Sequence, residues 1–536
     1  MYKHWFVSRQ KRRLTQILPA LIAFSDVCLG QKWAGNVELQ LKFEDELQNR
    51  SITEHGNLRA RRAGNGGGGT RTLFKQMKDL GLVFLEEENG HCQLTLVGEE
   101  LVKGNITFVD AIRMQLKRYQ YPSAACWSGS GSVSHDIKVH PFQFMFRLLR
   151  EPRLEGKLHV NELRYIVIHQ AISDSKHCFE KVVTEILNYR NDADYICEID
   201  DEKKTYWNIA NTFFNYISLT QYVDRGQQII FVRQGKENEI DEFIEESPKF
   251  IPNPELAENY LRAFGKGLSA KDMRDFKKAQ SWSQKEINEA RIRKEYVLLA
   301  LKTPILGITS DIINVISLNT GIDEREVEKF LIKNYPHKNI DDFFVNYKEL
   351  AHLGTDGAKE FEMATCELFK KIFKMRAKHI GPIGNTPDVF IESDDEKYCA
   401  IIDNKAYKNG YSITGNHKRV MEDVYIPNVK AYGGSEYPLV FFAYIAGSFG
   451  GNINAQLNEI YSNTGVKGSA MPVDILIDFA QAYAKLDYDH STIKKVFSVN
   501  REVRVSDIEE IVSYSDKMRE YESDLPIAAD IVPYNV

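Results

Sequence analysis

Residues 385 to 411 read NTPDVFIESDDEKYCAIIDNKAYKNGY, and this stretch decides the fold of the C-terminal third of the chain. Two apolar runs, VFI and YCAII, stand on either side of the charged segment SDDEK, which predicts two β-strands joined by a short turn. Asp388 stands at the start of the first strand, and Asp403 and Lys405 stand at the end of the second. Because side chains alternate along a strand, Asp403 and Lys405 share a face, and a hairpin brings Asp388 beside them. The sequence therefore predicts two carboxylates and one ammonium group in a small volume.

Such a group of side chains suits the hydrolysis of a phosphodiester. A hard cation such as Mg²⁺ prefers carboxylate oxygens, neutralises a phosphate and lowers the pKa of an attacking water. We expect Asp388 and Asp403 to hold the metal and the carbonyl of Asn404 to add a third oxygen. Lys405 is expected to orient the water or to stabilise charge on the phosphorus. A solvated strand edge or a surface ion pair is the alternative explanation of an Asp-X-Lys triplet.

The order Pro-Asp, strand, turn, strand, Asp-X-Lys resembles the PD-(D/E)xK nuclease core. DNKAYKNGY resembles the corresponding segment of the FokI-type cleavage domain of Type IIS restriction endonucleases. The preceding segment EFEMATCELFKKIF (360 to 373) fits the helix that flanks it in that domain. The following segment FFAYIAGSFGGNINAQLNEI (441 to 460) fits the strand, turn and helix that come next. The resemblance implies a mixed central sheet flanked by helices, with Asp388 and Asp403 as metal ligands and Lys405 as a catalytic residue. It also implies one or two Mg²⁺ ions per active site. Val389 stands where these domains usually have glycine, which puts only the local backbone geometry in doubt.

The same resemblance implies two further roles. Glu362 lies on the face of the first helix from which some family members add an acidic catalytic residue, although a Glu early in a helix also favours the helix dipole. Arg419 and Asp423, in GNHKRVMEDVYIPN, stand where the family forms a two-fold dimer contact through opposite charges, here with the signs apparently exchanged. An isologous contact survives that exchange, since each Arg still meets the partner's Asp. An ordinary intrahelical pair four residues apart is the alternative.

The composition is that of an ordinary globular protein. The 536 residues are enough for three or four domains, and with 27% charged residues and a net charge of −6, a DNA-binding role requires segregated positive charge. Seven cysteines without a CxxC pair indicate reduced intracellular thiols and no zinc site. The basic and apolar N-terminus lacks the cleavage motif of a signal peptide, and no apolar run is long enough to span a membrane.

Positive charge is indeed clustered in the first 135 residues, as RQKRR (9 to 13) and RARR (59 to 62) show. A helix is expected from the N-cap Thr70 to Leu80, ended by Gly81 and followed by two short strands about an Asn-Gly turn. This order predicts a winged helix whose helix enters the major groove, although many winged helices bind only protein. The side chains expected to be exposed and to contact DNA are Arg59, Arg61, Arg62, Arg71, Thr72, Lys75, Gln76 and Lys78.

The expected fold class is a multidomain α/β and α+β protein with four parts. These are a winged-helix DNA-recognition domain (1–135), a second mainly helical, winged-helix-like recognition subdomain (136–254), a helical linker (255–345) and a FokI-type endonuclease domain (346–536). GLVFLEEENGHCQLTLVGEELVKGN, LKRYQYPS and HPFQFMFRLLREPRL resemble the N-terminal recognition region of the AlwI and BstNBI group of Type IIS and nicking endonucleases. That resemblance covers the first 250 residues with gaps.

Together these patterns predict a Type IIS restriction endonuclease that binds a short asymmetric site in double-stranded DNA and cuts at a fixed distance outside it. The resemblance implies a transient homodimer of cleavage domains, a cognate DNA methyltransferase in the host, and a cytoplasmic, prokaryotic location without a membrane. A strand-specific nicking endonuclease and a catalytically inactive winged-helix DNA-binding regulator are the alternatives. The recognition sequence, the cleavage distance and the stagger depend on helix docking and DNA deformation, which side-chain identities do not give.

Overall fold

The computed structural model describes residues 4–7, 14–50, 52, 68–127, 136–192, 205–226, 228–246, 248–267, 272–276, 283–335, 338–381, 386–408, 410–433, 436–486 and 488–513. The chain divides into two compact units, Met1–Leu301 with Ile308–Pro336, and Lys302–Gly307 with His337–Val536. The helices that follow residue 283 are therefore shared between the units, and the division into four domains stays a prediction. No described helix is long and apolar enough to cross a membrane.

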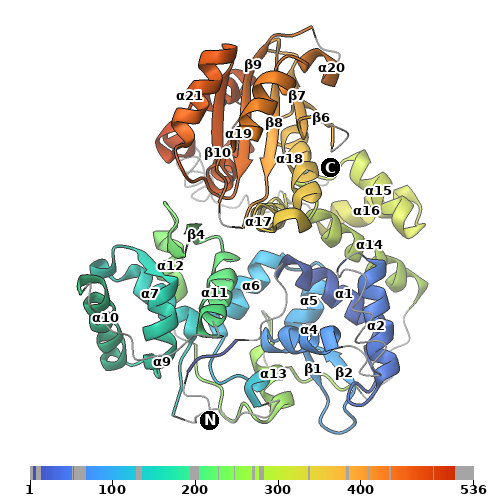
Figure 1. The fold of residues 1–536 in the computed structure, drawn as a ribbon. Helices are drawn as coiled ribbons and strands as arrows, with labels where there is room; N and C mark the ends of the chain where they lie inside the picture. The colour runs from blue at the N-terminus through green and yellow to red at the C-terminus, as the bar shows by residue number, and fades with distance from the viewer. Residues whose placement is uncertain are drawn as a thin grey trace, which may run out of the picture. The chain divides into compact units, whose positions relative to one another are not determined.

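The first unit is mainly helical (Figure 1). Its described helices are α1 (Ile17–Val27), α2 (Val37–Asn49), α4 (Gly68–Asp79), α5 (Leu96–Val102), α6 (Phe108–Arg118), α7 (Pro141–Arg150), α8 (Val160–Glu162), α9 (Ile168–Gln170), α10 (Lys176–Asn191), α11 (Thr205–Ser218), α12 (Glu237–Glu245), α13 (Ala257–Phe264), α14 (Gln284–Ala300), α15 (Ser310–Thr320) and α16 (Glu324–Asn334). The described residues of this unit also form two small antiparallel sheets. One pairs β1 (Val83–Leu85) with β2 (Cys92–Leu94), and the other places β5 (Ile229–Val232) between β3 (Lys157–His159) and β4 (Val223–Gly226).

The expected helix and hairpin of the first unit are present as α4, β1 and β2. The helix begins at Gly68, two residues before the expected N-cap Thr70, and the chain leaves it through Gly81 with φ +68°. A Cβ atom on Gly81 would lie 2.5 Å from the ring of Phe264, so both the backbone and the available space require glycine. The helix–strand–strand order is confirmed, and its use as a winged helix stays a prediction.

The second unit is built on one five-stranded sheet. Its strands are β6 (Arg376–His379), β7 (Val389–Ser393), β8 (Tyr398–Lys405), β9 (Leu439–Ala446) and β10 (Lys467–Pro472), in the order β10-β9-β8-β7-β6. The pairs β6/β7 and β7/β8 are antiparallel, and β8/β9 and β9/β10 are parallel. The sheet is therefore mixed, as predicted, with β8 in its centre. Every residue of β7 and nearly all of β8 is buried, which explains their continuous apolar runs.

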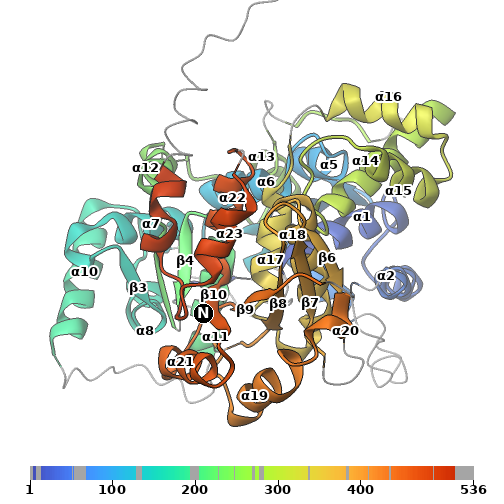
Figure 2. The ribbon, with the colours of Figure 1, turned by 90° about the horizontal axis from the view of Figure 1, so that it is seen from above.

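Helices cover both faces of this sheet. One face packs against α17 (Asp341–Leu350), α18 (Ala358–Lys371), α22 (Val473–Tyr483) and α23 (His490–Phe497). The other packs against α20 (Val429–Gly433), α21 (Ile453–Thr464) and the turn Met421–Tyr425 that continues α19 (Gly415–Val420). Figure 2 shows the strands between these two groups of helices. The expected helix at 360–373 and the expected strand and helix within 441–460 are confirmed as α18, β9 and α21.

Candidate active site

The hairpin of β7 and β8 brings the two predicted carboxylates to one face of the sheet. Val389 pairs with Ile402, so Asp388 and Asp403 are the next positions outward on the two strands. Residues opposite one another in an antiparallel pair project to the same side. Asp388 and Asp403 therefore lie on the side of the sheet that α21 covers, as Phe390 and Ile401 on the same strands do. The register thus puts both carboxylates at the same end of the hairpin, and their role as metal ligands stays a prediction.

The carboxylate of Asp388 is held next to β8. Its Oδ2 accepts the backbone N–H of Asn404 at 2.6 Å, and its backbone carbonyl accepts the N–H of Ile380 at 2.9 Å. Burial raises the pKa of Asp388 well above its ordinary value, and the negative charges of Asp403 and Glu362 raise it further, while Lys405 opposes them. The ionised form of Asp388 is therefore disfavoured, first by burial and then by its acidic neighbours.

Lys405 is paired with the second carboxylate. Its Nζ lies 2.8 Å from Oδ1 of Asp403, and both side chains are nearly buried. Burial alone would lower the pKa of Lys405, but the charge and hydrogen bond of Asp403, together with the charge of Asp388, raise it above its ordinary value. Lys405 is therefore protonated at neutral pH, on the same face as Asp403.

Asn404 projects its side chain to the opposite face of the sheet. Its Nδ2 donates to Oγ1 of Thr365 on α18 at 2.6 Å, and that hydroxyl also bonds the Tyr347 hydroxyl at 2.7 Å. These buried contacts fix β8 against α18 at the position between Asp403 and Lys405. The predicted contribution of Asn404 is its backbone carbonyl, and that role stays a prediction.

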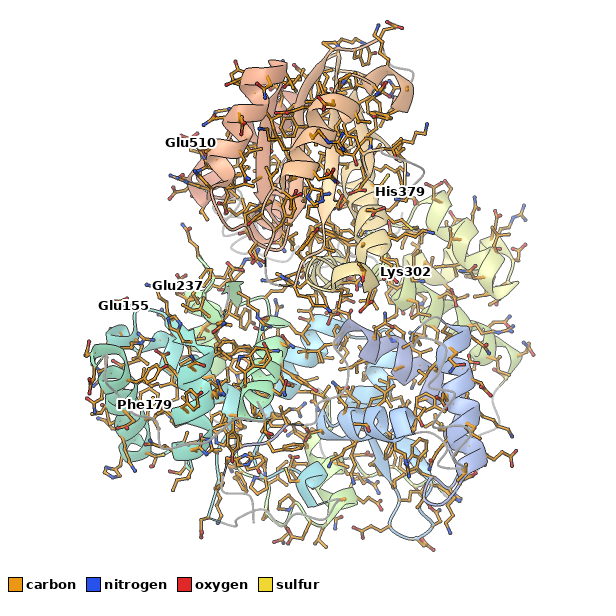
Figure 3. All side chains as sticks on the ribbon, viewed as in Figure 1. Glu155, Phe179, Glu237, Lys302, His379 and Glu510 are labelled. Atoms are coloured by element: carbon orange, nitrogen blue, oxygen red, sulfur yellow. The ribbon has the colours of Figure 1, made fainter. Side chains whose placement is uncertain are left out.

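Glu362 lies on α18 close to the same site. Its Oε2 is 2.9 Å from Nε2 of His379 on β6, whose side chain is labelled in Figure 3. Its charge contributes to the raised pKa of Asp388, so Glu362 is near enough to act on the site electrostatically. Glu362 thus acts on Asp388 through its charge, and its catalytic role stays a prediction.

Sequence reasoning missed two aromatic side chains beside Lys405, which are Tyr411 and Tyr444. The Nζ of Lys405 lies 5.8 Å from the ring centroid of Tyr411 and 6.0 Å from that of Tyr444. Tyr411 follows β8 in the predicted motif, and Tyr444 pairs with Asp403 across β8 and β9. The alternation of β9 could have indicated Tyr444, but the parallel register that places it beside Asp403 is a tertiary property.

His417, in the first turn of α19, contacts one of these two side chains, Tyr411. Its Nδ1 lies 3.0 Å from the hydroxyl of Tyr411. Burial lowers the pKa of His417 and the nearby ammonium of Lys405 lowers it further, although Asp403 acts in the other direction. Burial raises the pKa of Tyr411, as does the charge of Asp403. The hydrogen bond between Tyr411 and His417 therefore joins two neutral groups at neutral pH.

The donors at this site fit a hard divalent cation. Within the described ranges, no cluster of three or more His, Cys, Asp or Glu side chains could enclose a metal ion. Mg²⁺ needs no such cage, because proteins commonly bind it through one or two carboxylates, with waters and substrate phosphates as the other ligands. Asp388 and Asp403 match that set, and the raised pKa of Asp388 marks a place where a cation would relieve repulsion.

The side chains predicted to contact DNA in the first unit differ in exposure. Arg59, Arg61 and Arg62 lie outside the described residues. Arg71 is exposed on α4, and Thr72, Lys75 and Lys78 are half-buried. The expected exposure of Gln76 is wrong, because this side chain is fully buried and its Nε2 donates to the Tyr216 hydroxyl at 2.9 Å. The contact with α11 turns that face of α4 inward, which the helical pattern of α4 alone does not reveal.

Arg419 and Asp423 are both exposed on the predicted dimer face. Arg419 donates to Oδ1 of Asn416 at 3.2 Å, and no ion pair forms between the described side chains of Arg419 and Asp423. Their neighbours point the other way, because Lys418 pairs with Glu459 of α21 and Glu422 accepts from Nδ2 of Asn463 at 3.0 Å. The helix is anchored on one side and presents opposite charges on the other.

Two stretches of the chain match known protein families. Residues 321–504 match the FokI cleavage domain, and residues 112–242 match the N-terminal domain of the Type II restriction endonuclease HgaI. The first match contains every residue of the candidate site. The second covers part of the predicted recognition region, and the resemblance of that region to the AlwI and BstNBI group stays a prediction.

Individual relatives match over shorter lengths. The Type II restriction enzyme StsI from Streptococcus sanguinis is 29% identical over 147 residues, which cover 25% of this chain and 24% of StsI. The Type II restriction enzyme FokI from Planomicrobium okeanokoites is 25% identical over 197 residues, covering 34% of this chain and 31% of FokI. Both alignments thus span less than a third of the relative. A structure of FokI bound to DNA covers 94% of this chain and 99% of its own at 14% identity, but with a TM-score of 0.30.

Proposed function

We propose that this protein is a Type IIS restriction endonuclease, which binds a short asymmetric DNA sequence and hydrolyses phosphodiester bonds outside it. The observation that carries the proposal is the shared face of Asp388, Asp403 and Lys405 within a stretch that matches the FokI cleavage domain. The match of residues 112–242 to a Type II restriction endonuclease domain supports a recognition function in the same chain.

Each residue of the site has a role in this reaction. Asp388 and Asp403, with the carbonyl of Asn404, would hold one or two Mg²⁺ ions, which neutralise the scissile phosphate and lower the pKa of the attacking water. Lys405 keeps its proton beside Asp403 and stabilises the charge that develops on the phosphorus. Glu362 adds negative charge from α18 that favours cation binding. The rings of Tyr411 and Tyr444 lie beside the ammonium group of Lys405.

The first unit would supply sequence recognition. Its second subdomain runs through β3, the helices between 160 and 218, and the hairpin of β4 and β5, with β3 paired to β5. A strand, helices and a hairpin in this pairing order favour a second winged helix beside α4, β1 and β2. The exposed Arg71 and the basic runs of the N-terminal region would contact the DNA, in the manner of the AlwI and BstNBI group.

A single site cuts one strand, so breaking a duplex requires a second cleavage domain. Arg419 and Asp423 of two copies would meet across a two-fold axis, each Arg with the partner's Asp. The dimer would form transiently on DNA. As a restriction enzyme acting on DNA in the cytoplasm, the protein would work beside a cognate methyltransferase that protects the host's own sites.

Run-off sequencing of cleaved plasmid tests this proposal. Purified protein with Mg²⁺ should convert plasmid into discrete linear fragments whose ends lie at a constant distance from one short sequence. Accumulation of open circles, with one end per site, would instead identify a nicking endonuclease. Tight binding to one sequence without any metal-dependent break would contradict the nuclease proposal and favour a DNA-binding regulator.

A further inference from the structure

The proposed reaction needs the ammonium of Lys405 in one place, and Asp403 alone does not fix it. A lysine side chain has four rotatable bonds and loses considerable rotamer entropy when it is held. Asp403 contacts Lys405 at 2.8 Å, but the same carboxylate is the proposed ligand of a divalent cation. When Asp403 binds the cation, part of its attraction for Lys405 is lost. A second restraint on Lys405 would keep the ammonium in position.

The rings of Tyr411 and Tyr444 provide that restraint. Their centroids lie 5.8 Å and 6.0 Å from Nζ, within the distance at which an aromatic face attracts a cation. Tyr444 is part of β9, which lies between β8 and β10, and is completely buried. Its position is therefore set by the sheet, whereas Tyr411 follows β8 in a loop and must be held by other contacts.

Three hydrogen bonds hold Tyr411 in place. Its N–H donates to the Ser448 carbonyl at 2.8 Å, and its own carbonyl accepts the N–H of Gly450 at 2.9 Å. These bonds join the loop after β8 to the loop after β9. The third contact is the 3.0 Å hydrogen bond between its hydroxyl and Nδ1 of His417. His417 is itself placed by the N-cap of α19, where its N–H donates to Oγ1 of Thr414 at 3.2 Å.

We propose that Tyr411 and His417 form a positioning pair, in which His417 orients the ring of Tyr411 and that ring holds Lys405 for the cleavage step. This inference rests on the proposed function, because it assigns the pair to the same reaction. Neither residue is a catalytic residue, since each acts through Lys405. The pair also connects the active site to α19, the helix that carries Arg419 of the proposed dimer contact.

A double-mutant cycle tests the pair in the full chain. Tyr411→Phe keeps the ring and removes the hydroxyl, and His417→Leu removes the hydrogen-bonding partner of that hydroxyl. His417→Asn keeps a group that can both donate and accept a hydrogen bond. Single-turnover cleavage at saturating enzyme reports the chemical step, duplex binding in Ca²⁺ reports affinity, and thermal unfolding reports stability. Tyr461→Phe on α21 serves as the matched control, because that half-exposed tyrosine is far from Lys405 along the chain and no contact joins their described side chains.

We expect Tyr411→Phe and His417→Leu each to lower the cleavage rate about 10-fold, with unchanged DNA affinity. The double variant should be no slower than either single variant, because both changes remove the same hydrogen bond. His417→Asn should recover most of the rate. Independent, multiplying losses, or wild-type rates in both single variants, would overturn the inference.

A failure of the proposed function gives a different result. Wild-type protein that never cleaves DNA contradicts the nuclease proposal itself, and crystal structures of the wild type and of His417→Leu then test the pair without cleavage. The inference requires Lys405 to leave its position beside Asp403, Tyr411 and Tyr444 in the variant. An unchanged Lys405 in that crystal structure would overturn it.

Discussion

The buried carboxylate of Asp388 in the proposed site lowers the stability of the folded protein when it is ionised. Burial raises its pKa above the ordinary 3.8, and Asp403 and Glu362 raise it further. The folded protein therefore keeps this proton at pH values where the unfolded chain has released it. The stability contributed by the proton is present below pH 3.8 and is lost as pH rises through the raised pKa of the folded state.

Replacing Asp388 by asparagine should consequently stabilise the metal-free protein. Asparagine keeps an acceptor for the N–H of Asn404 and removes the buried charge. We expect the free energy of unfolding in EDTA to rise by about 1 kcal/mol at neutral pH, with the gain shrinking toward acidic pH. Denaturant unfolding across a pH series measures it. Asp395→Asn, in the exposed hairpin turn, is the control, and an Asp388→Asn variant that is less stable at every pH would contradict the charge account.

Magnesium should reverse this difference. A cation that binds only the folded state raises the free energy of unfolding by about 2.7 kcal/mol when its concentration is 100 times its dissociation constant. The unfolding temperature of the wild type should therefore rise with Mg²⁺ in the absence of DNA. Asp388→Asn should lose most of that rise and Asp395→Asn should keep it. Equal rises in all three proteins would show that the ion binds elsewhere.

Some residues of the site could be predicted from sequence and others could not. Asp388, Asp403 and Lys405 follow from strand alternation and a hairpin, which are local properties of one short stretch. Tyr444 and His417 come from a strand and a helix farther along the chain, so only the parallel register of β8 with β9 and the path of the loop reveal them. Gln76 was predicted on the wrong side of its helix for the same reason.

Among the helices and strands, α19 offers the clearest test of the proposed dimer. Lys418 of α19 and Glu422 of the turn Met421–Tyr425 anchor this region to α21, and Arg419 and Asp423 are left exposed. Arg419→Asp and Asp423→Arg should each weaken duplex cleavage severalfold, because like charges would then meet across the two-fold axis.

A mixture of the two variants should recover cleavage. In a mixed dimer, the aspartate that replaces Arg419 in one copy would face the arginine that replaces Asp423 in the other, and the second contact would remain between the unchanged Asp and Arg. Initial rates of plasmid linearisation for each protein alone and for the equimolar mixture measure this. A mixture no faster than its components would argue against the proposed contact, and unaffected single variants would favour nicking by a monomer.

The helix α4 carries both a predicted DNA contact and a residue of the protein core. Arg71 is exposed and Gln76 is buried against Tyr216. If Arg71 contacts a phosphate, Arg71→Gln should reduce the slope of log affinity against log salt by about 0.9. Gln76→Leu should lower the unfolding temperature and leave that slope unchanged. Fluorescence anisotropy at several salt concentrations measures the slopes, and a wild-type slope for Arg71→Gln would remove this residue from the DNA interface.

Element types were more predictable than their boundaries. The hairpin of β7 and β8, the helix α18 and the strand and helix β9 and α21 all carry strong local patterns, and each is present. The start of α4 at Gly68 instead of Thr70 reflects the weak boundary signal of a glycine-rich segment. The linker predicted at 255–345 contains several helices that belong to different units, because packing partners and not composition decide where such helices lie.

For the whole molecule, the proposed function assigns recognition to the mainly helical unit and cleavage to the unit with the mixed sheet. The match to the N-terminal domain of HgaI (residues 112–242) precedes the match to the FokI cleavage domain (residues 321–504), which is the expected order along the chain. Sequence reasoning predicted the mixed sheet and its flanking helices. It could not predict how the chain divides, since residues 302–307 belong to the second unit and 308–336 to the first. Such an exchange of segments is a property of tertiary contacts.

The central claim is that Asp388, Asp403 and Lys405 together cut DNA with a divalent cation. Single-turnover cleavage by Asp388→Asn, Asp403→Asn and Lys405→Gln, beside the hairpin-turn controls Asp395→Asn and Lys397→Gln, tests it most directly. The account predicts that each site variant loses at least about 100-fold in rate while it binds DNA in Ca²⁺ as the wild type does, and that both controls cut normally. Site variants that cut at the wild-type rate would contradict the claim.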